Sequence, residues 1–423
     1  MNILRVAFTT LGCKANWVDT ESVIQMCKGV GAEIVAFDDE ADIYVVNTCT
    51  VTSVADQQSR QMLRRAKRRS PKAIVVATGC VGETSKELLL EIDEVDQVFG
   101  TSDREGLLEF IFNQLDVDST AGEVQMPVEN QSRARSFLKI QDGCNRRCSY
   151  CIVPTARGRS RSVSMEAVVE AAVKLSKHHH EIVLTGIDIG QYGSDLSNAS
   201  LALLLDALLE EELDVRYRLS SLDPTLADDR IISLVRESGK ICRHVHLSIQ
   251  SCADGVLRVM GRGYGGDDVA KVIRRLVEQV PDIAVTGDVI AGFPGESEGD
   301  HRRTVEVLRS LPVAGLHIFP FSPRYGTRAY TLDGQVDKAE IKRRASELRE
   351  LATSARQDFL MGIVGKTFDS IVTSKISSDE NVVSAFSDNA VSVSLPAGVV
   401  EYGGIGKALI DRVDNLKVCG SWR

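Results

Sequence analysis

The chain has 423 residues, of which 43% are hydrophobic and 26% charged, a composition typical of folded water-soluble proteins with two or three domains. Its ten cysteines accompany no recognisable secretory signal, which argues against a disulfide scaffold and favours metal ligands or catalytic groups in a reducing, cytoplasmic compartment. The formal net charge of −9 argues mildly against nucleic acid as a partner, although a local basic stripe would be enough to hold phosphates. No apolar run is long enough to cross a bilayer, so we expect no membrane association.

The first hundred or so residues alternate between strand-like and helix-like segments. The predicted strands are 4–9, 43–47 and 73–78, and the predicted helices are 18–28 and 54–69. This alternation is typical of a mostly parallel sheet covered by helices. The polar stretch 116–136 shows neither periodicity and is predicted to be a linker.

A second alternation begins at residue 137. Its predicted strands are 137–141, 182–185, 215–220, 244–249, 284–290 and 315–319, and its predicted helices include 165–177, 268–280 and 301–309. Six strand–helix units in a row favour a partial (β/α)6 barrel over a doubly wound sheet, although periodicity alone does not separate the two.

The end of the chain changes in style. A charged amphipathic helix is expected at 338–361. After it come short alternating segments punctuated by Gly, Asn and Pro, at 368–373, 382–386, 390–395, 406–413 and 416–418. This pattern predicts a small antiparallel β-barrel.

The strongest chemical signal is a C-x-x-x-C-x-x-C loop made by Cys144, Cys148 and Cys151. It follows a predicted strand, and its three thiolates are close enough in sequence to hold one metal centre. A cubane 4Fe–4S cluster has four irons, so three cysteines leave one iron open for another ligand. The alternative is a zinc knuckle, but no histidine lies nearby to complete the four ligands of a structural zinc site.

A second set of cysteines, Cys13, Cys49 and Cys80, directly follows the first three predicted strands. The carboxyl ends of parallel strands lie side by side, so these three side chains are expected to converge. A small residue, glycine or threonine, precedes each of them and would let the backbone approach a bulky cluster. The alternative is three separate buried cysteines, which are common in protein cores.

Two basic segments are candidates for holding RNA phosphates. Residues 60–72 carry seven positive charges and no acid, and residues 157–161 carry three arginines. A solvated helix face is the alternative for the first segment. In the second, Arg157 and Arg159 match a carboxylate equally well. The histidines at 178–180 are expected to mark a helix end rather than a metal site.

The C-x-x-x-C-x-x-C loop resembles the signature of the radical S-adenosylmethionine superfamily. The resemblance implies that the open iron binds the amino and carboxylate groups of S-adenosylmethionine, whose cleavage gives methionine and a 5′-deoxyadenosyl radical. The residues that it implies as contacts of this cofactor are Thr185, Gly186, Asp188, Ser248, Gln250, Ile290 and Gly292, with Arg159 as a further candidate. Asp288 stands where the family's glycine-rich element has its first glycine.

The whole layout resembles the methylthiotransferase family within that superfamily. The implied domains are 1–120 with the second cluster, 133–362 with the radical barrel, and 363–423 as a TRAM-like RNA-binding module. Segments 12–16, 46–52 and 185–193 look most like the branch that modifies N6-threonylcarbamoyladenosine beside the anticodon. Cys252 and Trp17 depart from the family's usual residues.

This resemblance implies an enzyme that adds a methylthio group to C2 of that nucleoside in tRNA. It would use S-adenosylmethionine, two 4Fe–4S clusters held by the six cysteines named above, and an electron donor such as flavodoxin or ferredoxin. A methylthiotransferase acting on isopentenyladenosine in tRNA, or on an aspartate of a ribosomal protein, is the alternative within the enzyme class. A non-catalytic RNA-binding protein with structural zinc is the alternative from another class. The sequence does not predict the oligomeric state.

Overall fold

The computed structural model describes residues 3–50, 53–115, 133–374 and 381–423. The chain forms two compact units. The first comprises Met1–Pro127, Asp142–Arg147 and Cys151–Arg161, and the second comprises Val128–Gln141, Cys148–Tyr150 and Ser162–Arg423. Most of the predicted linker lies outside the described residues. Within the described part of the chain, no helix is long and apolar enough to span a membrane.

The first unit is built on a parallel sheet with strand order β2-β1-β3-β4-β5, which confirms the predicted parallel α/β fold. Its strands are β1 (Arg5–Thr10), β2 (Glu33–Val35), β3 (Ile43–Thr48), β4 (Ile74–Gly79) and β5 (Gln97–Val98). Its helices are α1 (Lys14–Gly29), α2 (Ser53–Arg69), α3 (Cys80–Thr84), α4 (Lys86–Leu90), α5 (Arg104–Asn113) and α6 (Val153–Arg157).

Both faces of this sheet are buried, which explains why its central strand, β3, is apolar from Ile43 to Val46. Tyr44 and Val46 of β3 belong to one hydrophobic cluster, whereas Ile43 and Val45 belong to another. Successive side chains of a strand point to opposite faces, so the two clusters are the two covered sides of the sheet. Helices α2 and α4 contribute to the first cluster, and α1 and α5 to the second.

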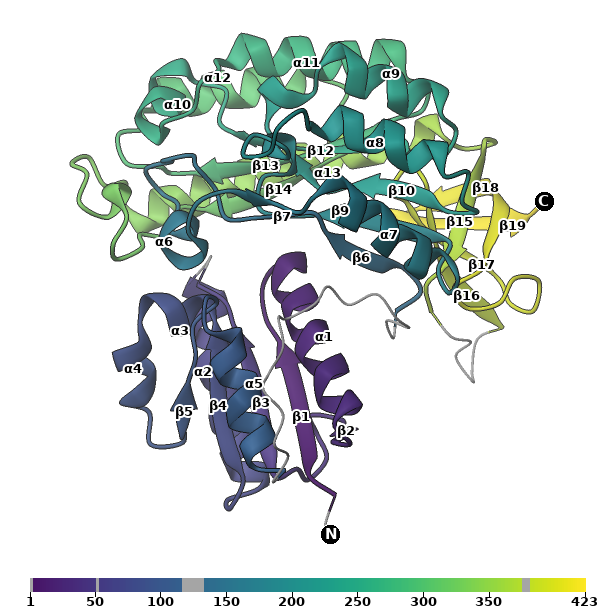
Figure 1. The fold of residues 1–423 in the computed structure, drawn as a ribbon. Coiled ribbons are helices and arrows are strands. Elements are labelled where there is room, and N and C mark those ends of the chain that lie inside the picture. The colour runs from purple at the N-terminus through teal and green to yellow at the C-terminus, as the bar shows by residue number, and fades with distance from the viewer. Residues whose placement is uncertain (1–2, 51–52, 116–132, 375–380) are drawn as a thin grey trace. The chain divides into compact units, whose positions relative to one another are not determined.

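The second unit has parallel strands at all six predicted positions, together with the short β11 (Figure 1). They are β6 (Ser136–Lys139), β9 (Glu181–Thr185), β10 (Arg216–Leu219), β11 (Ser221–Leu222), β12 (His244–Gln250), β13 (Ala284–Ala291) and β14 (Gly315–Pro320); the short β7 (Gln141–Asp142) and β8 (Arg161–Ser162) flank the cysteine loop. The parallel pairing forms a three-stranded sheet, β10-β9-β6, and a four-stranded sheet, β11-β12-β13-β14. Only Ser220 separates β10, in the first of these sheets, from β11, in the second. The two sheets are therefore continuous through this segment, as expected for a partial barrel.

Helices cover the outer side of these strands (Figure 1). They are α7 (Met165–Ser176), α8 (Leu201–Glu210), α9 (Asp229–Glu237), α10 (Asp254–Met260), α11 (Gly266–Gln279), α12 (Glu298–Arg309) and α13 (Lys338–Gly362), with short 3-10 turns at Ile189–Gln191, Pro224–Leu226 and Arg328–Tyr330. The carboxyl ends of the strands are therefore connected to the helices by loops, the position where barrel enzymes build their sites.

The C-terminal segment is a closed barrel with strand order β15-β16-β17-β19-β18. The strands are β15 (Thr367–Val372), β16 (Val382–Ser387), β17 (Ser392–Pro396), β18 (Ile405–Asp414) and β19 (Lys417–Trp422). The barrel was predicted as antiparallel, and all its pairs are so except β17 with β19, which run parallel. Its core includes Phe368, Val393 and Ile410.

A buried ion cluster attaches this barrel to the strands of the second unit. The carboxylate of Glu181 accepts hydrogen bonds at 2.7 Å from Nε of Arg216 and Nε of Arg218. The same two guanidinium groups donate to the backbone carbonyls of Asp369 and Ser387 in the barrel. Burial alone would raise the pKa of Glu181, but the arginines outweigh it and hold that pKa well below its usual range.

Candidate functional site

The structure brings the predicted second trio of cysteines together at the carboxyl edge of the first unit's sheet. Cys13 precedes α1, Cys49 follows β3, and Cys80 begins α3. The Oδ1 atom of Asn16 lies 3.6 Å from Sγ of Cys13 and 3.7 Å from Sγ of Cys80. A Cβ atom added at Gly12 would lie 2.5 Å from Sγ of Cys49, so this thiol packs against the backbone next to Cys13.

Asn16 also ties together the two loops that carry Cys13 and Cys49. Its Nδ2 donates to the carbonyls of Leu11 and Thr48, each at 3.0 Å. The carbonyl of Leu11 comes just after β1, and that of Thr48 is at the end of β3. One buried amide therefore fixes the distance between the ends of these two strands. The sequence does not reveal this role, because Asn16 lies just before the predicted helix 18–28 and its partner Thr48 is 32 residues away.

The glycine that precedes Cys80 is required by geometry. Gly79 has φ +91°, a backbone conformation that other residues rarely adopt, and a Cβ atom there would lie 2.2 Å from Oδ1 of Asn47. A small residue is predicted before each cysteine, and at Gly79 the reason is the close approach of β3 to the turn that leads into α3.

A buried arginine completes the environment of this trio. Nη2 of Arg157 donates to Oδ1 of Asn16 at 2.5 Å and to Asp19 at 3.0 Å, and Nη1 donates to Asp142 at 2.8 Å. The side chain of Arg157 is 2% exposed. Burial raises the pKa of the Cys80 thiol to about 12, and the charge of Arg157 acts in the opposite direction. The prediction that Arg157 faces a phosphate or cofactor carboxylate is therefore wrong, because carboxylates of the chain itself already pair with it.

The C-x-x-x-C-x-x-C loop is shaped by backbone contacts in the first unit. The N–H of Cys144 donates to the carbonyl of Gly158 at 3.1 Å, and the N–H of Arg146 donates to Sγ of Cys144 at 3.4 Å. Gly143 has φ +71°, and a Cβ atom there would lie 2.0 Å from the carbonyl oxygen of Arg159. Cys144 and Cys151 are partly exposed, as is Cys148, so all three thiols can reach an external metal centre.

In the second unit, Arg262 contacts the middle cysteine of this loop. Its Nη1 lies 3.3 Å from Sγ of Cys148, while its Nη2 donates to Asp223 at 2.6 Å and to Oγ of Ser248 at 3.0 Å. Ser248 is a predicted cofactor contact, so Arg262 connects that position to a predicted cluster ligand. Sequence reasoning assigned Arg262 no role, because its partners come from three separate segments.

The other predicted S-adenosylmethionine contacts of the second unit lie at the carboxyl ends of its strands. Thr185 ends β9, and the loop after it is held by Oε1 of Gln141, which accepts from the N–H groups of Ile187 at 3.0 Å and Asp188 at 2.9 Å. A Cβ atom at Gly186 would lie 2.8 Å from the carbonyl oxygen of Gln141. Gln141 is thus a positioning residue that the sequence analysis missed.

The strands β12 and β13 end in strained or tight turns. Gln250, which ends β12, has φ +65°, an unfavourable conformation for a residue with a side chain. Gly292 follows β13 with φ +76°, and its N–H donates to Glu296 at 2.7 Å. Arg344 donates to the same carboxylate at 2.9 Å. Ile290 precedes this turn on β13, whereas Arg159 is an exposed residue of the first unit.

The basic segment 60–72 has fewer free charges than its sequence suggested. Four of its seven cations have carboxylate neighbours: Arg60 with Asp56, Arg64 with Glu94, Arg65 with Asp38, and Lys67 with Asp96. For Arg68, Arg69 and Lys72, the described residues include no ion-pair partner, and all three are exposed. A phosphate contact from this segment would therefore rest on these three side chains.

Two family matches cover most of these elements. Residues 5–100 match the family described as Uncharacterized protein family UPF0004. Residues 138–308 match the Radical SAM superfamily. Among solved structures, the chain resembles the radical S-adenosylmethionine methyltransferase TsrM from Kitasatospora setae, with a TM-score of 0.55 and 16% identity over 78% of this chain and 77% of that one. The fold and the cysteine loop thus define a radical S-adenosylmethionine enzyme.

Sequence relatives identify the family of radical S-adenosylmethionine enzymes to which the chain belongs. The chain is 38% identical to the threonylcarbamoyladenosine tRNA methylthiotransferase MtaB of Aquifex aeolicus, over 87% of this chain and 93% of the relative. It is 36% identical to the protein of the same name in Bacillus subtilis, over 92% of this chain and 89% of the relative. The chain therefore belongs to the methylthiotransferase family of radical S-adenosylmethionine enzymes, in its MtaB branch.

Proposed function

We propose that this chain attaches a methylthio group to C2 of N6-threonylcarbamoyladenosine in tRNA, in the position beside the anticodon. The observation that carries the proposal is the convergence of Cys13, Cys49 and Cys80 around Asn16, in a chain that also has the C-x-x-x-C-x-x-C loop. A radical enzyme needs only the loop, so a second trio of thiols points to sulfur transfer. The names of the relatives at 36–38% identity supply the nucleoside.

The chemistry explains why such a cofactor set is needed. The hydrogen on C2 of an adenine is not acidic, so a general base cannot remove it at neutral pH. When bound, S-adenosylmethionine and the clusters supply the methyl group, the sulfur and the radical reactivity that this bond requires. The products would be the methylthiolated nucleoside, S-adenosylhomocysteine, methionine and 5′-deoxyadenosine.

The residues present fit two 4Fe–4S clusters. Cys144, Cys148 and Cys151 would hold the one that serves S-adenosylmethionine, and their partial exposure leaves room for that cofactor. The second trio would hold the other cluster, since the thiols of Cys13 and Cys80 share Asn16 as a neighbour and that of Cys49 lies beside Gly12. Arg262 would donate a hydrogen bond to a cluster ligand, Cys148, a contact that tunes iron–sulfur centres.

An aromatic pair in the second unit offers a surface for the substrate. Tyr325 is 86% exposed, and its ring lies 5.8 Å from that of Tyr330 in an edge-to-face arrangement. The segment that carries them is joined to the cysteine loop, because the N–H of Ala329 donates to the carbonyl of Ser149 at 2.7 Å. Exposed aromatic rings stack on unpaired bases, so Tyr325 is positioned as a contact for an anticodon-loop base.

The remaining parts of the proposal concern partners and location. The reaction consumes electrons, so an electron donor such as flavodoxin or ferredoxin would serve it, and the cytoplasm is where tRNA and such donors meet. The C-terminal barrel would act as a TRAM-like RNA-binding module. The limits 1–120, 133–362 and 363–423 remain our prediction for the three domains.

The test is to supply the anaerobically reconstituted enzyme with S-adenosylmethionine, a reductant and one substrate at a time. The substrates are tRNA bearing N6-threonylcarbamoyladenosine, tRNA bearing isopentenyladenosine, and the ribosomal protein with the target aspartate. Mass spectrometry should find a methylthio group in place of one hydrogen only on the first. The proposal would be overturned if a methylthio group appeared on either of the other two substrates, or if none of the three substrates acquired one.

A variant with Cys13, Cys49 and Cys80 replaced by Ala is the matched control. It should still cleave S-adenosylmethionine to 5′-deoxyadenosine, because the other cysteine loop is intact, but it should transfer no methylthio group. A colourless wild-type protein that contains zinc and no iron would instead support the RNA-binding alternative.

A further inference from the structure

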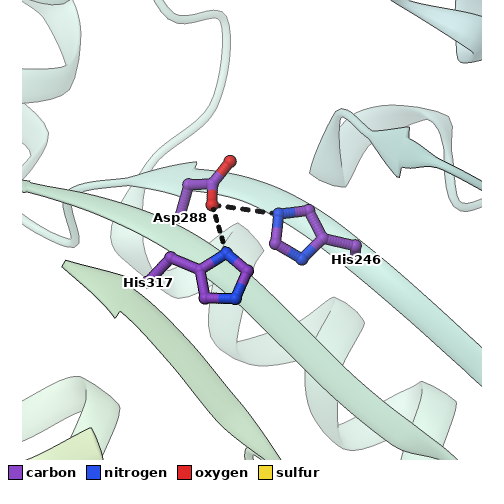
Figure 2. A group of neighbouring side chains, drawn as sticks. All are labelled: His246, Asp288 and His317. Atoms are coloured by element: carbon purple, nitrogen blue, oxygen red, sulfur yellow. Dashed lines mark hydrogen bonds and ion pairs between the residues drawn. The ribbon is translucent and has the colours of Figure 1, made fainter. Parts of the chain in front are cut away.

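Three potential metal ligands lie next to one another on the four-stranded sheet of the second unit (Figure 2). His246 is on β12, Asp288 on β13 and His317 on β14. The residues that alternate with them, such as Leu247 and Val289, are buried. Because successive strand residues point to opposite faces, the three polar side chains share the less covered face of this sheet.

The distances in this group match those between ligands of one metal ion. Oδ1 of Asp288 lies 3.0 Å from Nε2 of His246 and 3.2 Å from Nδ1 of His317. Adjacent ligands at metal bonds of about 2.1 Å are separated by about 3.0–3.4 Å in octahedral and tetrahedral sites. One ligand atom from each of the three residues lies within 4.8 Å of the others. His317 is 67% exposed, so its ring can rotate to bring its ligand nitrogen closer to that of His246.

A neighbouring hydroxyl fixes the orientation that His246 needs as a ligand. Oγ1 of Thr286 lies 2.8 Å from Nδ1 of His246 and 3.0 Å from Nε2 of His244. If Nδ1 of His246 carries the proton, it donates to Thr286, and the hydroxyl donates onward to His244. Nε2 of His246 faces Oδ1 of Asp288 at 3.0 Å, and a bound metal ion would take the place of the hydrogen between these two atoms. Outer contacts of this kind are typical of metal-binding histidines.

The chemistry of the three side chains indicates which metal ions would bind. Two imidazoles and one carboxylate suit Fe²⁺, Co²⁺, Ni²⁺ or Zn²⁺, whereas Mg²⁺ and Ca²⁺ prefer oxygen ligands alone.

We propose that His246, Asp288 and His317 form a mononuclear site for a divalent first-row transition metal ion, separate from the two cysteine trios. Three protein ligands leave coordination positions open, so the ion would also bind water or an oxygen atom of a ligand on this face of the sheet. The site gives a role to Asp288, which stands where the related glycine-rich element begins with glycine.

The test uses the enzyme with its clusters reconstituted and Co²⁺ as the probe. After dialysis against Co²⁺, the wild type should retain one cobalt per chain by elemental analysis. The bound cobalt should give a high-spin signal in electron paramagnetic resonance, where oxidised 4Fe–4S clusters are silent. His317→Ala should weaken the affinity for cobalt more than about tenfold, and Asp288→Asn should do the same. Iron and sulfide contents should stay unchanged in both variants.

His180→Ala is the matched control, because His180 is also an exposed histidine whose Nδ1 lies near a carboxylate, 3.7 Å from Asp214. It should bind cobalt like the wild type. Absence of bound cobalt in the wild type, or equal binding in His317→Ala, would overturn the proposal and leave the group as a hydrogen-bonded cluster only. Because the readout is cobalt binding without tRNA, its failure would not affect the proposed reaction.

Discussion

Asn16 offers the sharpest test of how the second cysteine trio is held. Its side chain makes two hydrogen bonds to backbone carbonyls, those of Leu11 and Thr48, and accepts a third from the charged Arg157. A neutral buried hydrogen bond contributes about 1 kcal/mol and one to a charged group about 2 kcal/mol. Asn16→Ala should therefore destabilise the first unit by about 4 kcal/mol at most, since neighbouring interactions are not additive.

The main effect should fall on the trio rather than on the fold. Without the amide, the loops of Cys13 and Cys49 lose their common anchor, and Arg157 loses one of its partners beside Cys80. We expect the reconstituted variant to carry about half the wild-type iron and sulfide. It should still cleave S-adenosylmethionine to 5′-deoxyadenosine, whereas methylthio transfer should disappear.

The assay is iron and sulfide per chain, with both products measured by mass spectrometry and stability measured by urea unfolding. Asn113→Ala, an exposed asparagine at the end of α5, is the control and should behave like the wild type. Asn16→Asp keeps an oxygen for Arg157 but replaces the amide donor, so it separates the two roles. Full iron content and normal methylthio transfer in Asn16→Ala would refute the reasoning.

Three further predictions follow from other parts of the molecule. Replacing all three cysteines of the C-x-x-x-C-x-x-C loop by Ala should leave about half the iron, and complete loss would mean that only one cluster exists. Glu181→Ala should destabilise the second unit by about 3–5 kcal/mol in urea unfolding at pH 7, because two buried arginines lose their partner. Since the pKa of Glu181 is depressed in the folded protein, this contribution is present above its unfolded value of about 4.3 and should shrink as the pH falls below it; a constant difference would contradict the ion-pair account. Tyr325→Ala should weaken tRNA binding by about 1–3 kcal/mol in fluorescence anisotropy without changing RNA-independent cleavage of S-adenosylmethionine, and unchanged affinity would exclude stacking.

The strands and the clustering of the second trio could be predicted because both depend on local patterns. The apolar runs that form β3 and β4 are followed at once by Cys49 and Cys80, and parallel pairing then brings the strand ends together. The short elements α3, α4 and β5 were missed, because two to five residues carry too little periodicity to be recognised.

The contacts around the cysteines could not be predicted, since their partners are far apart in sequence. Arg157, Arg159 and Arg161 alternate in one short segment and look equivalent. The structure buries Arg157 and exposes the other two, because only Arg157 meets Asp19 and Asp142. Asp19 lies 138 residues away in the chain, and no local rule relates it to this segment.

The segment around Arg157 also explains why the two cysteine sets need not fail together. Cys144 and Cys151 belong to the same compact unit as the second trio, and Arg157 is part of that unit. The guanidinium of Arg157 keeps two hydrogen bonds to Asp142, just before the cysteine loop, whatever happens at Asn16. Loss of Asn16 therefore removes the anchor of one trio but leaves this bond next to the other. That asymmetry is the physical reason why Asn16→Ala is expected to lose half of its iron and not all of it.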